Sequence, residues 1–125
     1  MKDLALAQFS KDATRIVGIN STGSVAVFDA DSARRLAGPW KLLEAVTRAA
    51  FSPNGQWLGV GTTAERLVLF DLRNDRQSAV IDLHSSAPSP GLGSKVMGIE
   101  FDPASDHVLA CTYGGSLSAA TRVPV

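Results

Sequence analysis

Residues 46–71 read VTRAAFSPNGQWLGVGTTAERLVLFD, and this segment decides the fold. It contains three short runs rich in Val, Leu and Phe, and turn-forming residues separate the runs. Such runs between Gly, Pro, Asn and Asp are typical of β-strands. Pro53-Asn54-Gly55 predicts a tight reversal, because proline fixes its own φ and Asn-Gly tolerates positive φ. The segment therefore predicts three antiparallel strands joined by tight turns.

The same pattern occurs three times along the chain. With Phe51 as the reference, Phe9 stands 42 residues before it and Phe101 stands 50 residues after it. Both spacings lie within or near the range at which self-similarity indicates stacked structural repeats. The places of Leu58, Phe70 and Asp71 are taken by Ile16, Phe28 and Asp29 in the first copy and by Val108, Ala120 and Thr121 in the third. We therefore expect three similar units, each in the same register without a gap.

The amino-acid sequence of these units resembles a known repeat. Residues 51–61 (FSPNGQWLGVG) together with 67–71 (LVLFD) are similar to the WD40 repeat, whose common form has a Phe-Ser-Pro-Asp-Gly turn and ends in Trp-Asp. Phe28-Asp29, Phe70-Asp71 and Ala120-Thr121 stand at the Trp-Asp place. The resemblance covers nearly the whole chain and implies that each unit is one blade of a β-propeller. The implied fold is all-β, a partial β-propeller of three WD40-like blades of antiparallel strands, the last blade lacking its outer strand.

The units depart from the WD40 pattern in their polar residues. WD40 blades often carry a Gly-His pair before the first strand and an Asp in the turn before the last inner strand. These residues form a buried hydrogen-bond network with a Ser or Thr and the Trp. Here Lys41-Leu42 and Gly91-Leu92 take the Gly-His place, and Thr22, Ala64 and Gly114 take the Asp place. We therefore expect the network to be absent and apolar packing to stabilise the sheets.

The repeat divides the chain into residues 1–42, 43–94 and 95–125. In the first unit, an outer strand at 34–36 is expected to end at Gly38-Pro39-Trp40. In the second, an outer strand at 78–83 precedes a Pro/Gly/Ser-rich surface loop at 85–94. The third unit is expected to end with a strand at 116–121.

Composition narrows the class of protein. Apolar residues make up 45% and charged residues 19%, which is ordinary for a soluble globular domain. Twelve basic residues balance twelve acidic ones, so no overall field attracts nucleic acid or an anionic membrane. A single cysteine, Cys111, excludes an internal disulfide framework. No apolar run approaches the roughly 20 residues of a membrane span, and no signal peptide is evident. The expected location is the cytoplasm or the nucleus.

No pattern of residues predicts catalysis, a metal or a cofactor. His107 and Cys111 stand four apart on one expected strand and would lie about 13 Å apart, too far to share one ion. Residues 91–95 (GLGSK) lack the spacing of a phosphate-binding loop. A propeller hydrolase would need polar residues on the first strands, which offer only Gln8, Thr47, Arg48 and Glu100. We therefore expect a non-enzymatic protein without cofactor or metal.

The remaining expectation is a scaffold for protein–protein interaction, because loops on a rigid framework carry recognition. Trp40 lies beside Gly38-Pro39 and is expected to be an exposed anchor, whereas Trp57 is expected to pack between blades. The candidate partner-binding residues are Trp40, Lys41, Glu65, Arg66, Ser89, Pro90, Leu92 and Tyr113. Two alternatives stay open, a subunit of a nucleic-acid-associated complex and a fragment of a propeller hydrolase.

Three blades do not close a ring, and closure is what removes exposed edges from propellers. If four or five large side chains lose their cover at each end, at roughly 2 kcal/mol each, the cost is on the order of 10 kcal/mol per face. That cost is comparable to the roughly 5–15 kcal/mol stability of a whole domain. The partners are therefore other proteins or remaining blades. The chain is expected to be a segment of a longer propeller, to assemble as a homo-oligomeric ring, or to be completed by another protein.

Overall fold

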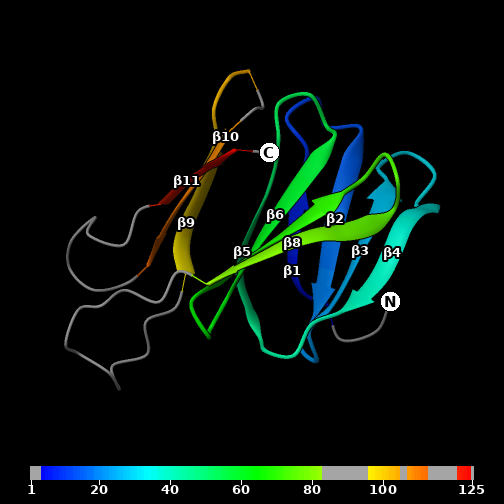
Figure 1. Cartoon of the computed structure of the whole chain (residues 1–125). Coiled ribbons are helices and arrows are strands. Elements are labelled where there is room, and N and C mark those ends of the chain that lie inside the picture. Colours follow the sequence, from blue (N-terminus) through cyan, green and yellow to red (C-terminus); the bar gives the residue numbers. More distant parts are fainter. Residues whose placement is uncertain (1–3, 83–95, 105–106, 113–120, 125) are drawn as a thin grey trace.

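The computed structural model describes residues 4–82, 96–104, 107–112 and 121–124, and all regular structure in them is β-strand (Figure 1). The strands form three antiparallel sheets, each in chain order. The first sheet contains β1 (Leu4–Phe9), β2 (Arg15–Asn20), β3 (Ser24–Asp29) and β4 (Arg35–Lys41). The second contains β5 (Val46–Phe51), β6 (Trp57–Thr62), β7 (Arg66–Asp71) and β8 (Arg76–Asp82). The third contains β9 (Val96–Phe101), β10 (His107–Thr112) and β11 (Thr121–Pro124). The expected all-β fold of antiparallel strands is confirmed, and this part of the chain has no helix that could cross a membrane.

The three reference phenylalanines occupy one register. Phe51 pairs with Leu58 and Leu58 with Phe70, and in the first sheet Phe9, Ile16 and Phe28 pair in the same way. We call each such row the Phe row of its sheet. We call the side of the sheet to which the row points the Phe face, and the other side the opposite face. The repeat deduced from residue spacing is therefore present in the strand pairing.

The third sheet departs from the expected register. Val108 pairs with Phe101 on one side and with Val123 on the other, so Val123 completes the third Phe row. The gap-free register, which placed Ala120 there, is wrong by three residues. An odd shift of this kind exchanges the two faces of a strand. The expected strand at 116–121 lies mostly outside the described residues.

The turns between the first two strands also repeat. The Ser52 hydroxyl donates to Asn54 Oδ1 (2.7 Å) and accepts the Trp57 N–H (3.0 Å). The backbone turns at Gly55 with φ of 73°. The first sheet builds the same turn from Ser10, Asp12, Arg15 and, at the positive φ of 60°, Ala13. The turn chemistry expected at residues 53–55 is therefore present in two copies.

The second sheet lies between the other two (Figure 1). Its Phe face, with Phe51, Leu58 and Phe70, packs against the opposite face of the first sheet. On its own opposite face, Leu67 and Leu69 pack against the Phe face of the third sheet. The first-sheet residues in this core are Val17, Ile19, Val25 and Val27, and the third-sheet residues are Val96, Phe101, Val108 and Ala110. At both junctions, therefore, the Phe face of one sheet packs against the opposite face of the preceding sheet.

Two glycines allow the third sheet to approach the second. A Cβ on Gly61 would lie 2.3 Å from Val96 Cγ1, closer than atoms can pack. A Cβ on Gly59 would lie 3.2 Å from Ile99 Cγ2 and 3.4 Å from the Phe101 ring. The distance between these sheets is therefore set by residues without a side chain.

Polar contacts also join neighbouring sheets. Arg15 Nη1 donates to the Gly55 carbonyl (3.0 Å), and the Gly38 N–H donates to Asp75 Oδ1 (2.9 Å). The Thr47 hydroxyl donates to the Val96 carbonyl. Strands β1, β5 and β9, the first strand of each sheet, lie next to one another in that order.

Strand β4 differs from the expected short outer strand. It continues through Gly38-Pro39-Trp40 to Lys41, with irregular pairing to β3 and a cis Gly38–Pro39 peptide bond. Proline is tolerated there because β4 is an edge strand, where one missing N–H breaks no ladder. Gly38 has a φ of 78°, and a Cβ there would lie 2.7 Å from the Val25 carbonyl oxygen. The expectation that this tripeptide ends the strand is wrong.

Candidate protein-binding groove

A groove of about 140 Å³ lies where the linker after β4 meets the outer strands of the second sheet. Its lining residues come from the end of β4, from the linker after it, from β7 and from β8: Lys41, Leu42, Leu43, Glu44, Arg66, Val68, Gln77 and Val80. Leu42 and Val68 are buried and form an apolar floor. The groove therefore joins two sheets at the outer end of their junction.

Two apolar side chains at the groove are exposed to solvent. Leu43 is 93% exposed and Val80 is 51% exposed. Val80 pairs with Val68 across β7 and β8 and so lies on the Phe face of the second sheet, at a place that the first sheet does not cover. Single exposed apolar residues are common, but two that border one groove form a small patch of the kind that marks binding sites.

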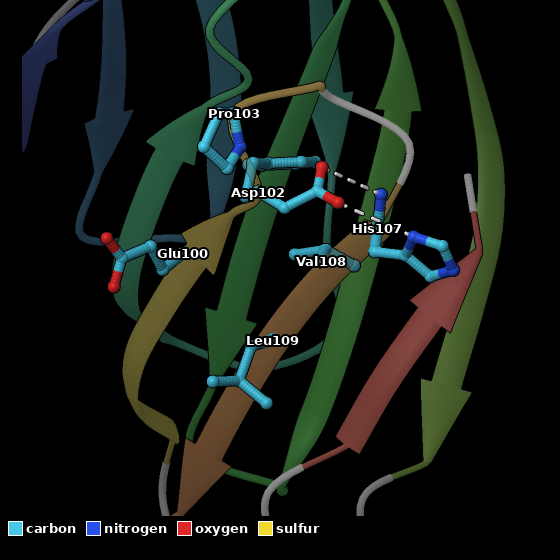
Figure 2. A pocket seen from close by; sticks show the side chains of 7 residues that line it. Glu100, Asp102, Pro103, His107, Val108 and Leu109 are labelled. Carbon is cyan, nitrogen blue, oxygen red and sulfur yellow. Dashed lines mark hydrogen bonds and ion pairs between the residues drawn. The ribbon is translucent and has the colours of Figure 1, made fainter.

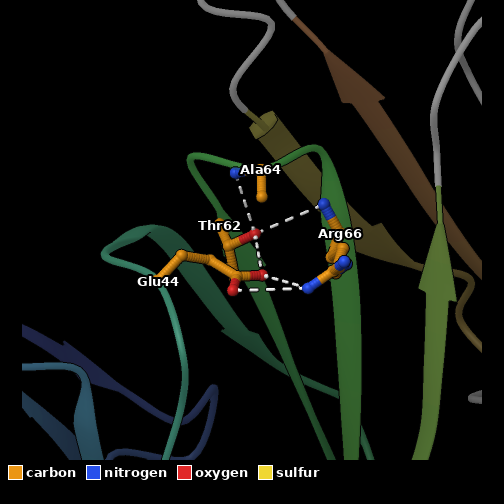
Figure 3. A network of polar contacts seen from close by, with 4 residues as sticks. All are labelled: Glu44, Thr62, Ala64 and Arg66. Atoms are coloured by element: carbon orange, nitrogen blue, oxygen red, sulfur yellow. Dashed lines mark hydrogen bonds and ion pairs between the residues drawn. The ribbon is translucent and has the colours of Figure 1, made fainter.

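Glu44, Thr62 and Arg66 form a polar network beside this patch, shown in Figure 3. Glu44 Oε1 accepts from the Thr62 hydroxyl (3.1 Å) and from Arg66 Nη1 (3.3 Å). Thr62 Oγ1 in turn accepts the N–H of Ala64 (3.2 Å) and of Arg66 (3.3 Å). The network ties the linker to the β6–β7 turn. It therefore fixes the backbone next to Leu43.

This network occupies the place where the sequence led us to expect only apolar packing. The residue types of the WD40 network are not there, yet buried Thr62 still organises the turn. Asn20, which is 42 residues earlier, does the same in the first sheet: its Oδ1 accepts from Thr22 N (3.1 Å) and Ser24 N (2.9 Å). These turn-capping hydrogen bonds are therefore present in addition to the apolar packing of the sheets. In the sequence, Asn20 and Thr62 stand at the same repeat position, and both are residue types that cap turns, so this pattern could have predicted the hydrogen bonds.

The structure brings together only some of the expected partner-binding residues. Lys41 and Arg66 both line the groove, and Glu65 lies in the adjoining turn with a φ of 59°. Trp40 instead stacks on Phe70, with ring centroids 4.3 Å apart, and packs against the core. The expectation of an exposed Trp40 is therefore wrong, because β4 continues and turns the ring inward. The other expected residues, Ser89, Pro90, Leu92 and Tyr113, lie outside the described residues.

Trp57 is placed as expected, since it packs against the core between the second and third sheets. Leu43 and Val80 were not foreseen. Leu43 lies in a linker without strand periodicity, so no pattern predicted its direction. Val80 lies in a strand with the expected alternation, but nothing in the sequence indicated that the first sheet stops short of it.

The groove carries more positive than negative charge. Lys41 and Arg66 are its cations and Glu44 is its one carboxylate. Arg66 uses Nη1 on Glu44, and its guanidinium has further donors on a side chain that is 39% exposed. Lys41 Nζ donates to the Thr22 carbonyl at the exposed surface. The groove is therefore suited to a ligand that combines a carboxylate with an apolar group.

Strand β8 borders the groove and is an outer strand. It hydrogen-bonds to β7 on one side and to no other described strand on its other side. Unlike β4 and β11, β8 contains no proline. Proline and irregular pairing protect an edge strand from pairing with another chain, and β8 has only one irregularity. Its edge can therefore accept an added strand.

A second hollow, of about 290 Å³, lies on the third sheet (Figure 2). His107 Nδ1 lies 3.5 Å from Asp102 Oδ2, and the His107 N–H donates to Asp102 Oδ1 (3.3 Å). These contacts close the β9–β10 turn. The described lining contains no Ser, Thr, Cys or Lys beside this pair, and no described cluster of residues could hold a metal ion.

No protein-family model matches the chain, and no curated protein matches it in sequence.

Proposed function

We propose that the chain is a non-catalytic protein-binding module whose sheets are WD40-like propeller blades. Its groove receives an extended segment of a partner protein. Each sheet repeats one register, and the Phe faces of the second and third sheets each cover the opposite face of the preceding sheet. The first strands β1, β5 and β9 lie side by side, as the inner strands of propeller blades do around their axis. These features support the propeller arrangement.

The exposed pair Leu43 and Val80 over a buried floor is the observation that carries the binding role. Leaving these side chains in water costs free energy that a partner's apolar side chain would recover. Lys41 and Arg66 would pair with a neighbouring Asp or Glu of the partner. The edge of β8 would supply backbone hydrogen bonds. The partner segment is thus extended, with an apolar residue close to a carboxylate.

A phage-displayed library of random peptides, selected on the immobilised full chain, tests this proposal. We expect enrichment of peptides that place an apolar residue next to Asp or Glu. Synthetic peptides from the selection should bind the Leu43→Ser variant about tenfold more weakly, because about 1.4 kcal/mol of apolar contact is lost. Leu36→Ser is the matched control, since Leu36 is also an exposed leucine and does not line the groove.

Selection of the same peptides by the Leu43→Ser variant with undiminished affinity would contradict the groove as the binding site. So would a selection that enriches no peptide over bare support. Binding that weakens steeply with salt for every sequence would instead indicate a purely electrostatic surface.

A further inference from the structure

The Phe face of the first sheet has no cover in the described part of the chain. Phe9 is 58% exposed, whereas Phe51 and Phe101, at the same repeat position, are 6% exposed. Ile16 and Phe28 complete this row and are only partly buried. The same row is buried by a neighbouring sheet at both internal junctions. The open face therefore has the composition of an interface.

Among the residues that the structure describes, none covers the opposite face of the third sheet either. Leu109 on this face is 44% exposed and borders the hollow of about 290 Å³. Figure 2 views this face, with the second sheet behind it and with Leu109 and Glu100 in front. A cavity of roughly 150 Å³ is enough to hold a benzene ring. The hollow can therefore accommodate an aromatic side chain.

We infer that a second copy of the chain covers both open faces. In this arrangement the Phe face of the first sheet in each copy packs on the opposite face of the third sheet in the other copy. Phe9 of one copy lies at the hollow beside Leu109 of the other. Each contact then repeats the arrangement of the two internal junctions.

The sizes of facing side chains support this pairing. At the internal junction Gly59 faces Ile99 and the Phe101 ring, so a residue without a side chain meets a large one. The repeat places Leu109 at the position of Gly59, and Ala7 at the position of Ile99. A large residue would then meet a small one, and the combined volume stays similar. The Phe face of the first sheet and the opposite face of the third sheet are therefore complementary in side-chain size, as the faces at the internal junction are.

The area of the contact favours two junctions over one. A face of three or four strands measures about 20 Å by 15–20 Å, from the rise per residue and the spacing of strands. Two junctions cover four such faces, roughly 1,200–1,600 Å², which is the range of stable complexes. One contact between two Phe faces would cover about half of that, the size of a crystal contact. Two copies also bring together six of the described sheets, which is within the usual four to eight blades of the proposed propeller.

Sedimentation of the full chain across a concentration series tests the inference. We expect a dimer, and we expect monomers from Phe9→Lys and from Leu109→Lys, each of which spoils both junctions. Val80→Lys, at a similarly exposed position away from both end faces, should remain a dimer.

Mixing Phe9→Lys with Leu109→Glu is the decisive arm. One junction of the mixed pair is then unaltered and the other places a cation opposite a carboxylate, so the mixture should form a dimer although neither variant does so alone. A monomeric unaltered chain overturns the inference, and so does a Leu109→Lys variant that dimerises as well as the unaltered chain, because that result indicates contact between two Phe faces. Peptide binding at the groove is measured separately with the Leu43 variant, so the two proposals fail independently.

Discussion

The hydrogen bonds of the β1–β2 turn determine the pKa of Asp12. Its Oδ1 accepts from the Thr14 N–H (3.0 Å), the Thr14 hydroxyl (2.7 Å) and the Ser10 hydroxyl (2.7 Å). These bonds, the Thr14 backbone bond foremost, lower the pKa of Asp12 from 3.8 to about 2. Asn54 occupies the same place in the second sheet and keeps the turn without a charge.

The first prediction concerns Asp12→Asn. Ionised Asp12 stabilises the folded chain fully above pH about 4, and this contribution is lost as the pH falls from about 4 to about 2. The variant should keep the turn, as Asn54 does, and its free energy of unfolding should depend less on pH in that window. Urea denaturation over a pH series measures this. Asn54→Asp is the mirror control and should add acid sensitivity, and identical pH profiles for Asp12→Asn and the unaltered chain would contradict the assignment.

The second prediction concerns Ala13, which has a φ of 60° where the second sheet has Gly55 at 73°. A side chain in this left-handed region is strained, and glycine is not. Ala13→Gly should therefore raise the free energy of unfolding by about 0.5–1 kcal/mol. Ala5→Gly, in strand β1, should lower it by a similar amount. A destabilised Ala13→Gly variant would show that the turn does not have this geometry.

At the scale of the strands, the third prediction concerns the approach of β9 to β6. Gly61→Ala would place a Cβ 2.3 Å from Val96 Cγ1. Overpacking of this kind should cost about 1–3 kcal/mol of stability. Gly59→Ala, whose Cβ would have 3.2 Å to Ile99, should cost less. Adding Val96→Ala to Gly61→Ala should recover part of the loss in a double-mutant cycle, and strictly additive losses would show that the two residues do not meet.

Most strands followed from the sequence because two independent signals coincided. In β1–β3 and β5–β7, apolar runs and turn residues recur at one spacing, and the strand pairing has that register. The prediction was wrong at β4, where Pro39 suggested an end. The edge position of that strand, which makes a proline harmless, is a property of the assembled sheet. It was also wrong at β11, since a register cannot be deduced from alanines and serines that favour no face.

The groove was predicted only in part. Lys41 and Arg66 were found because loops between strands were expected to carry recognition. Leu43 and the network of Glu44 with Thr62 depend on contacts between a linker and a distant turn. Such contacts leave no periodic pattern in a single sequence.

For the molecule as a whole, the fourth prediction follows from the central place of the second sheet. Both of its faces are covered, whereas the first and third sheets each have an open face in the described residues. Amide hydrogen exchange should therefore be slowest in β6 and β7 and faster in the strands of the first and third sheets. Mass spectrometry of the exchanging full chain measures this. Slower exchange in β2 and β3 than in β6 and β7 would contradict the order of stability.

The turn at Asn54-Gly55 also bears on how the protein ages. Asn-Gly is the dipeptide most prone to deamidation, in which the glycine nitrogen attacks the asparagine side-chain carbonyl carbon, ammonia leaves and a cyclic imide forms, which water then opens. In this turn the Gly55 N–H donates to the Ser52 carbonyl (2.9 Å), and the Asn54 amide oxygen accepts the Gln56 N–H (2.9 Å). Both reacting groups are therefore held by other bonds while the turn is closed. Conversion of this one residue to aspartate or isoaspartate on storage would record how often the turn opens.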